Sequence, residues 1–128
     1  MGVDSANTVL CVDDNPGILK LVEAIFANLP AQLVTARDGA SGLEIARGQR
    51  PCLILLDAGL PDMDGFTFLE SLRVDETTSH IPVVIVSGDA MSQEKKRLAR
   101  LGVVDCLIKP FDIVEFEQLV LRYLGAQR

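Results

Sequence analysis

Five short apolar runs alternate with five segments of helical periodicity, and this alternation predicts a doubly wound α/β fold on a five-stranded parallel sheet. Three of the runs, Thr8–Val12, Leu53–Leu56 and Pro82–Val86, are almost uninterrupted, as expected of strands that helices cover on both faces. A chain of 128 residues has the usual length of one domain. We therefore expect a single domain over residues 1–128, with its core from about 7 to 125.

The first predicted strand, Thr8–Val12, leads into a helix. Asn15 is expected to cap this helix, Pro16 to occupy its first position and Pro30 to end it. Apolar residues follow at helical spacing: Ile18, Leu21, Val22, Ile25 and Leu29.

A weaker second strand is expected at Leu33–Ala36. The dipeptide Asp38-Gly39 then turns the chain into a short helix that carries Leu43, Ile45 and Ala46. The third strand, Leu53–Leu56, is followed by a helix that Asp64 is placed to cap. The apolar residues of that helix are Phe66, Leu69 and Leu72.

The last part of the chain supplies two more strand–helix units. Pro82–Val86 is the fourth strand, and a helix over Ser92–Leu101 is expected to end at Gly102. Cys106–Ile108 is the fifth strand, and Asp112 with Glu115 resembles a capping box. The final helix carries Ile113, Phe116, Leu119, Val120, Tyr123 and Leu124.

Composition restricts the class of function. The formal net charge of -6 argues against general binding to nucleic acid or to a membrane surface, because both carry negative charge. No apolar run reaches the roughly 20 residues of a membrane span, and the polar N-terminus does not resemble a signal peptide. Cys11, Cys52 and Cys106 are expected to be reduced thiols in a cytoplasmic protein. The sequence has one histidine, His80, and a zinc site would need more ligands.

Polar residues follow the predicted strands at their carboxyl ends, where folds of this class bind ligands. Asp13 and Asp14 follow the first strand, Asp57 the third, Ser87 the fourth and Lys109 the fifth. Three neighbouring carboxylates repel one another unless a cation joins them. Oxygen ligands favour a hard ion, and Mg²⁺ (or Mn²⁺) is the expected cofactor.

A metal and a lysine beside a carboxylate form a place for a phosphoryl group. Asp57 can itself be the nucleophile and form an aspartyl phosphate, and Ser87 can donate a hydrogen bond to it. Gly59 is expected to let a backbone carbonyl approach the metal, and Pro61 to stiffen the loop.

The motifs "VDDN", "LLDAGLPDMDG", "VSG" and "IKPF" occur in order at these strand ends, and in them the sequence resembles the CheY-like receiver domains of two-component response regulators. The resemblance covers essentially the whole chain and implies the flavodoxin-like strand order 2-1-3-4-5. It implies that Asp57 accepts phosphate from a histidine kinase or phosphotransfer protein. It also implies metal binding by Asp13 (largely through water), Asp14, Asp57 and the Gly59 carbonyl, with Ser87 and Lys109 contacting the phosphoryl group.

The same resemblance implies a signalling switch that phosphorylates and dephosphorylates itself and is not a turnover enzyme. The expected readout surface is the face of the fourth helix, fifth strand and fifth helix, with Gly88, Asp89 and Cys106 as switch residues. Gly59 and Asp89 hold positions that tune dephosphorylation in the family. Cys106 stands where the family usually has an aromatic ring, so a modest shift of Gly88 to Met91 is expected rather than a ring flip.

The resemblance also favours a cis Lys109–Pro110 bond, and X–Pro bonds are the ones for which cis is cheap. The domain is expected to be a monomer or weak dimer that binds its kinase or phosphotransfer protein and a downstream partner, but neither nucleic acid nor membrane.

Three other functions compete with this interpretation. A receiver-like module could bind partners without phosphorylation. A Mg²⁺-dependent phosphohydrolase of the haloacid dehalogenase type would carry a second acid where Gly59 stands. A nucleotide or flavin module would need a glycine-rich phosphate loop, which the sequence lacks.

Other charged residues fit solvated or capping roles. His80 is expected to be a solvated loop residue. The acids assigned to solvation or capping are Asp62, Asp64, Asp105 and Asp112. The cations Lys95, Lys96, Arg97 and Arg100 form either a solvated helix face or a docking surface.

Overall fold

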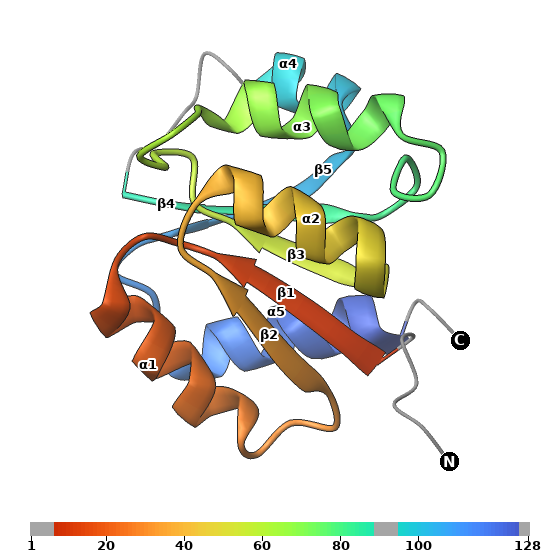
Figure 1. Ribbon diagram of the computed structural model, residues 1–128. Coiled ribbons are helices and arrows are strands. Elements are labelled where there is room, and N and C mark those ends of the chain that lie inside the picture. The colour runs from red at the N-terminus through yellow and green to blue at the C-terminus, as the bar shows by residue number, and fades with distance from the viewer. Residues whose placement is uncertain (1–6, 89–94, 126–128) are drawn as a thin grey trace.

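The computed structural model describes residues 7–88 and 95–125. Five parallel strands form one sheet in the order β2-β1-β3-β4-β5, and helices alternate with them along the chain (Figure 1). The predicted fold class and strand order are therefore confirmed. The strands are β1 (Thr8–Val12), β2 (Gln32–Ala36), β3 (Leu53–Leu56), β4 (Val83–Ser87) and β5 (Val103–Ile108). The helices are α1 (Pro16–Phe26), α2 (Gly39–Gln49), α3 (Gly65–Val74), α4 (Lys95–Arg100) and α5 (Ile113–Gly125).

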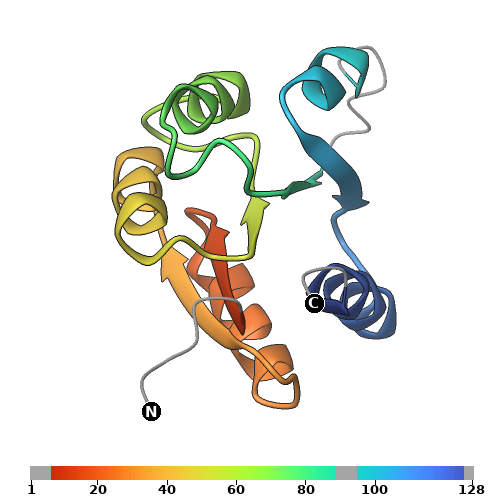
Figure 2. The same ribbon diagram turned by 90° about the vertical axis from the view of Figure 1, so that its right-hand side faces the viewer.

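The sheet is sandwiched between two groups of helices. α1 and α5 pack on one face, whereas α2, α3 and α4 pack on the other (Figure 2). Every residue of β1 and β3 is buried, while most residues of the edge strands β2 and β5 are half-buried or exposed. This difference explains why the central strands are continuous apolar runs.

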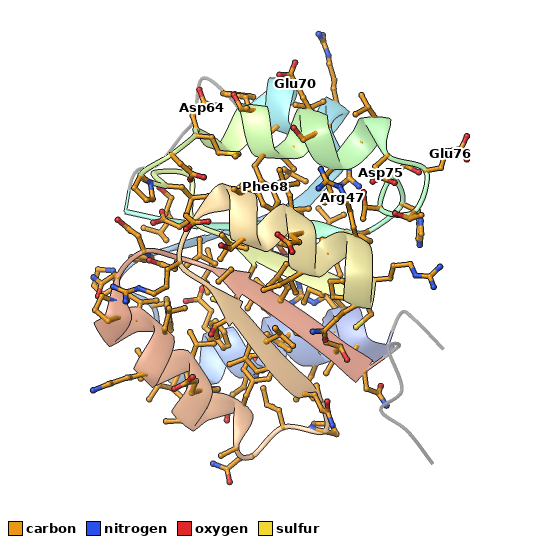
Figure 3. All side chains as sticks on the ribbon, in the orientation of Figure 1. Arg47, Asp64, Phe68, Glu70, Asp75 and Glu76 are labelled. Carbon is orange, nitrogen blue, oxygen red and sulfur yellow. The ribbon has the colours of Figure 1, made fainter. Side chains whose placement is uncertain are left out.

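Each face of the sheet has its own apolar core. Phe116 of α5 contacts Phe26 of α1 edge to face, with ring centroids 6.1 Å apart. On the opposite face Phe68, a residue of α3, is fully buried in the core covered by α2, α3 and α4 (Figure 3). Arg47 of α2 pairs with Asp75, just after α3, at 3.1 Å, which ties these two helices together at their C-terminal ends.

Helix caps follow the sequence with one change. Asn15 accepts hydrogen bonds from the amides of Gly17 and Ile18, and Asp64 accepts one from the amide of Thr67 at 2.8 Å. Asp112 also caps its helix, but it accepts from Val114 at 2.7 Å rather than from Glu115 three residues on. The capping-box prediction is thus half right: Asp112 is the cap, and its partner is one residue closer.

Two predicted boundaries differ by more than one residue. α1 ends at Phe26, because the amides of Asn28 and Leu29 bond to carbonyls three residues back and tighten the chain into a turn. β5 begins at Val103 rather than at Cys106, because it is a partly exposed edge strand in which the polar residue Asp105 pairs with Val84 after a register shift. The start of the helix expected from Ser92 falls in 89–94, outside the described residues.

Gly102 ends the segment after α4 with a φ of +85°, the left-handed conformation expected of a helix terminator. A Cβ at this position would lie 2.5 Å from the guanidinium of Arg73. That guanidinium bonds the carbonyls of Leu101, Gly102, Thr78 and Ser79, so it joins the end of α3 to the α4–β5 turn. Within the described chain, no helix has the length and apolarity of a membrane span.

Candidate functional site

Three carboxylates meet beyond the carboxyl ends of β1 and β3. The amide of Asp57 bonds the carbonyl of Val12 at 2.9 Å, and the amide of Asp13 bonds that of Ala36 at 3.0 Å. These bonds continue the sheet ladder by one residue and fix both backbones. As a result, Asp13, Asp14 and Asp57 each place one oxygen within 4.8 Å of the others, which is the convergence that the strand ends predict.

Lys109 brings a positive charge into this cluster from the end of β5. Its Nζ lies 2.7 Å from Asp13 Oδ2 and 3.8 Å from Asp57 Oδ2. Asp13 is only 2% exposed, and its other carboxylate oxygen accepts from the amide of Asn15 at 2.9 Å. Both oxygens of Asp13 therefore have partners, whereas the exposed Asp14 offers its carboxylate at the edge of the site.

The electrostatics of Asp57 favour an added cation. Burial raises the pKa of this carboxyl, and the charges of Asp13 and Asp14 raise it further. The Gly59 amide, 3.3 Å from Asp57 Oδ1, and the ammonium of Lys109 act in the opposite direction. One lysine thus faces three acids, and a divalent ion with oxygen ligands fits the donor set that remains.

The loop after Asp57 is held in two ways. Gly59 forms an isolated bridge with Asp64. Asp62 accepts hydrogen bonds from the first two amides of α2, those of Gly39 and Ala40, at 2.8 and 2.9 Å. Asp62 is therefore a capping residue, as predicted, but its helix lies 23 positions earlier. Local sequence patterns could not identify that partner.

The ends of β4 and β5 place the other two predicted site residues next to each other. The amide of Lys109 donates to the carbonyl of Ser87 at 2.8 Å, and Ser87 pairs with Ile108 in the sheet register. The Lys109–Pro110 peptide bond is cis, in agreement with the expectation from the sequence. Gly88 is exposed beyond β4.

Of the proposed switch residues Asp89 and Cys106, the structure describes only Cys106. Asp89 lies outside the described residues, as does Met91. Cys106 is half-buried on β5 and packs against the core beneath α2, α3 and α4.

Cys11 is a residue of this region that the sequence did not single out for the site. It lies beneath Asp13 and Asp57 and lines a cavity of about 10 Å³ with them. Burial raises the pKa of its thiol to about 12, and the neighbouring Asp13 charge acts in the same direction. Cys11 is therefore a neutral packing residue.

Known proteins resemble this chain over most of its length. The family of the response regulator receiver domain matches residues 9–121. The chain is 33% identical to the sensor protein GacS of Pseudomonas syringae pv. syringae over 94% of its own length and 14% of GacS. It is 35% identical to the histidine-protein kinase BarA of Escherichia coli K12 over 92% of its own length and 13% of BarA. The chain thus spans about one seventh of these curated relatives.

A shorter relative matches almost end to end. The polar-differentiation response regulator DivK of Brucella anthropi is 31% identical, with 92% of this chain and 96% of DivK covered. The receiver domain of sensor histidine kinase PA1611 from Pseudomonas aeruginosa has a TM-score of 0.83 at 28% identity, covering 93% of this chain and 98% of that one. That structure holds a magnesium ion in its active-site cleft. Chemotaxis response regulator CheY4 of Vibrio cholerae has a TM-score of 0.83 at 26% identity, covering 91% and 97%.

Proposed function

The chain belongs to the response regulator receiver domain family, the signalling domains of two-component systems, and on that premise we propose that Asp57 is its phosphoacceptor. The observation that carries the proposal is the geometry at the carboxyl edge of the sheet. Three carboxylates lie together with one lysine. Asp57 is central in this group because both other acids and the lysine act on it.

Asp14, Asp57 and the Gly59 carbonyl are the proposed ligands of Mg²⁺ (or Mn²⁺), with Asp13 acting largely through water. The bound ion supplies neutralisation of the carboxylates and of the oxygens of an incoming phosphoryl group. The acid cluster itself supports this assignment, because Lys109 balances only one of its three negative charges. The magnesium ion in the PA1611 receiver domain supports it by analogy.

The chain's own residues have separate tasks in the transfer. A carboxylate oxygen of Asp57 bonds to phosphorus as the P–N bond of a phosphohistidine breaks, and that electron pair stays with the imidazole nitrogen. The ammonium of Lys109 lies 2.7 Å from Asp13 and 3.8 Å from Asp57. It can therefore form an ion pair with the oxygens of a phosphoryl group on Asp57. Ser87 is proposed to donate its hydroxyl to them from the end of β4.

The proposed phosphodonor is a histidine kinase or a histidine phosphotransfer protein. GacS and BarA are sensor kinases of which this chain matches about one seventh, while DivK is a response regulator of similar length. All three are consistent with a histidine donor. The proposed role is therefore a switch in a phosphorelay, at a cytoplasmic location where such kinases present their phosphohistidine.

Mass spectrometry with acetyl phosphate tests the assignment. The protein should gain one phosphate in the presence of Mg²⁺ and none in chelator, and Asp57→Asn should gain none. Asp38→Asn is a matched control, because Asp38 only caps α2 and asparagine caps equally well. Labelling that persists in Asp57→Asn, or that is equal in chelator, would show that the phosphoacceptor lies elsewhere.

Readout is proposed on the face of α4, β5 and α5. Drawing the Ser87 hydroxyl toward a phosphoryl group would move Gly88 and the chain after it. Apolar side chains stand exposed on β5 and α5: Val104, Ile108, Ile113, Val114 and Leu121. Amide chemical shifts with beryllofluoride should change at Gly88 and along β5. Shifts confined to the loops after β1 and β3 would mean that the signal leaves through another surface.

A further inference from the structure

A second hollow lies at the opposite edge of the sheet. Its volume is about 350 Å³, within the range of small-molecule sites. It is formed where the loop before β4 meets the turn between α4 and β5. The lining residues are Arg73, Ser79, His80, Ile81, Pro82, Arg100, Leu101, Gly102 and Val104.

This hollow is separate from the Asp57 site. Pro82 immediately precedes β4, and Gly102 immediately precedes β5, so the hollow lies at the amino ends of these strands. Asp57 and Lys109 follow the carboxyl ends of β3 and β5. In a parallel sheet these are opposite edges: the loop between α3 and β4 lies on one side of Figure 1 and the loops after β1 and β3 on the other.

Arg73 supplies a half-buried positive charge to the hollow. Its guanidinium donates to four backbone carbonyls, the closest being that of Leu101 at 2.6 Å. Among the described residues no carboxylate lies within ion-pair distance of it. A guanidinium has five N–H donors, and its Nη2 group makes only one bond, to the Gly102 carbonyl at 3.4 Å. One N–H of a charged, partly desolvated group therefore remains for an outside acceptor.

One exposed residue adds to the positive charge. Arg100 lines the hollow from α4, His80 lines it from the loop before β4, and none of the lining residues is acidic. The net charge of the whole chain is -6, so this positive region runs against the overall charge. General electrostatics would repel anions from the molecule, and an anion bound here would be held by these local groups.

The nearby acids have partners or directions of their own. Asp75 is paired with Arg47 and also accepts from Thr77. Glu76 points outward from the loop, away from the body of the protein (Figure 3). Asp105 pairs with Arg122 on the α5 side. None of them neutralises Arg73 within the described residues.

The walls are apolar where the cations are not. Ile81 is buried, Pro82 and Leu101 are half-buried, and Val104 is 46% exposed. A ligand that matches this lining has a charged oxygen head against Arg73 and Arg100 and an apolar body against Pro82 and Val104. We propose that the hollow is a binding site for a small organic anion with a carboxylate or phosphate head, independent of phosphorylation at Asp57.

Two phosphonates that differ only in their apolar body test the proposal. Amide shifts are followed in the intact protein, without metal and with chelator, during titration with phenylphosphonate and with methylphosphonate. Both should shift the amides of Ser79, His80 and Gly102, and phenylphosphonate should bind about tenfold more tightly, because its ring removes apolar surface from water. Benzoate should shift the same amides if a carboxylate head is accepted as well.

Charge variants separate a built site from general attraction. Arg100→Gln should weaken phenylphosphonate binding about tenfold, since it removes a charge-assisted hydrogen bond. Lys20→Gln removes the same charge from the exposed side of α1 and should change the affinity by less than about twofold.

The proposal is overturned by any of three results. The shifts could be confined to the Asp57 edge, the two phosphonates could bind equally, or Lys20→Gln could weaken binding as much as Arg100→Gln. Each result would mean that the hollow does not recognise a ligand.

Discussion

Replacing Asp57 with asparagine should stabilise the metal-free protein while it abolishes phosphorylation. The substitution keeps the size of the side chain and an oxygen that can accept from the Gly59 amide. It removes a charge that burial and two neighbouring acids disfavour. The folded state therefore loses a repulsive interaction that the unfolded chain does not have.

The magnitude follows from the geometry. Carboxylate oxygens within 4.8 Å of one another repel by about 3 kcal/mol per pair at an effective dielectric constant of about 20. Asp57 faces two such acids, and Lys109 at 3.8 Å attracts it by about 4 kcal/mol. The balance is a net repulsion of about 2 kcal/mol, which screening of the partly solvated carboxylate reduces to about 1 kcal/mol. A melting temperature about 4 °C higher is expected for Asp57→Asn in chelator.

Thermal and urea unfolding in chelator measure this difference, with Asp38→Asn as the control that should change little. Because the pKa of Asp57 is raised in the folded state, its neutral form stabilises the fold below the unfolded value of 3.8. That contribution is lost as pH rises through the raised pKa. The gap between variant and wild type should thus be small in acid and open toward neutral pH. Added Mg²⁺ should stabilise the wild type more than the variant. An Asp57→Asn protein no more stable than wild type at neutral pH in chelator would refute the charge argument.

Three further outcomes follow from single contacts. Gly102→Ala should destabilise the protein by about 2 kcal/mol or more, because it strains a φ of +85° and displaces Arg73. The control Gly48→Ala, in open space on α2, should stabilise the protein by up to about 1 kcal/mol. Equal effects of the two variants in urea unfolding would contradict this. Asp62→Ala should lower the melting temperature at neutral pH. Because the pKa of Asp62 is lowered in the folded state, the difference in melting temperature between variant and wild type should close as pH falls below about 3.8. A difference that does not depend on pH would argue against the hydrogen bonds from the Gly39 and Ala40 amides. Cys11 is buried and its thiol has a pKa of about 12, so it should react with a thiol reagent only as fast as the protein unfolds. Prompt labelling of Cys11 in the native protein, located by peptide mapping, would disprove its burial.

The positions of the strands and of their terminal residues could be predicted from local patterns. Continuous apolar runs mark β1, β3 and β4 because these strands are buried on both faces. The polar residue that follows each run must lie at the carboxyl edge of the sheet, and this predicts that Asp13 and Asp57 meet, as they do. Edge strand β5 was underestimated, because its half-exposed residues include Asp105 and do not form an apolar run.

Tertiary structure decided the contacts whose partners are distant in sequence. Three contacts each select one partner among chemically equivalent ones. Asp62 caps α2, Lys109 lies closer to Asp13 than to Asp57, and Arg73 of α3 bonds the carbonyl of Gly102. Any acid can cap a helix, and any carbonyl can accept a hydrogen bond from a guanidinium, so the side-chain type alone does not select the partner. The sequence by itself determined which residue types stand at the strand ends, because burial dictates hydrophobic periodicity locally. Packing of the helices on the sheet determined which of them meet, because distances between distant segments exist only once the chain has folded.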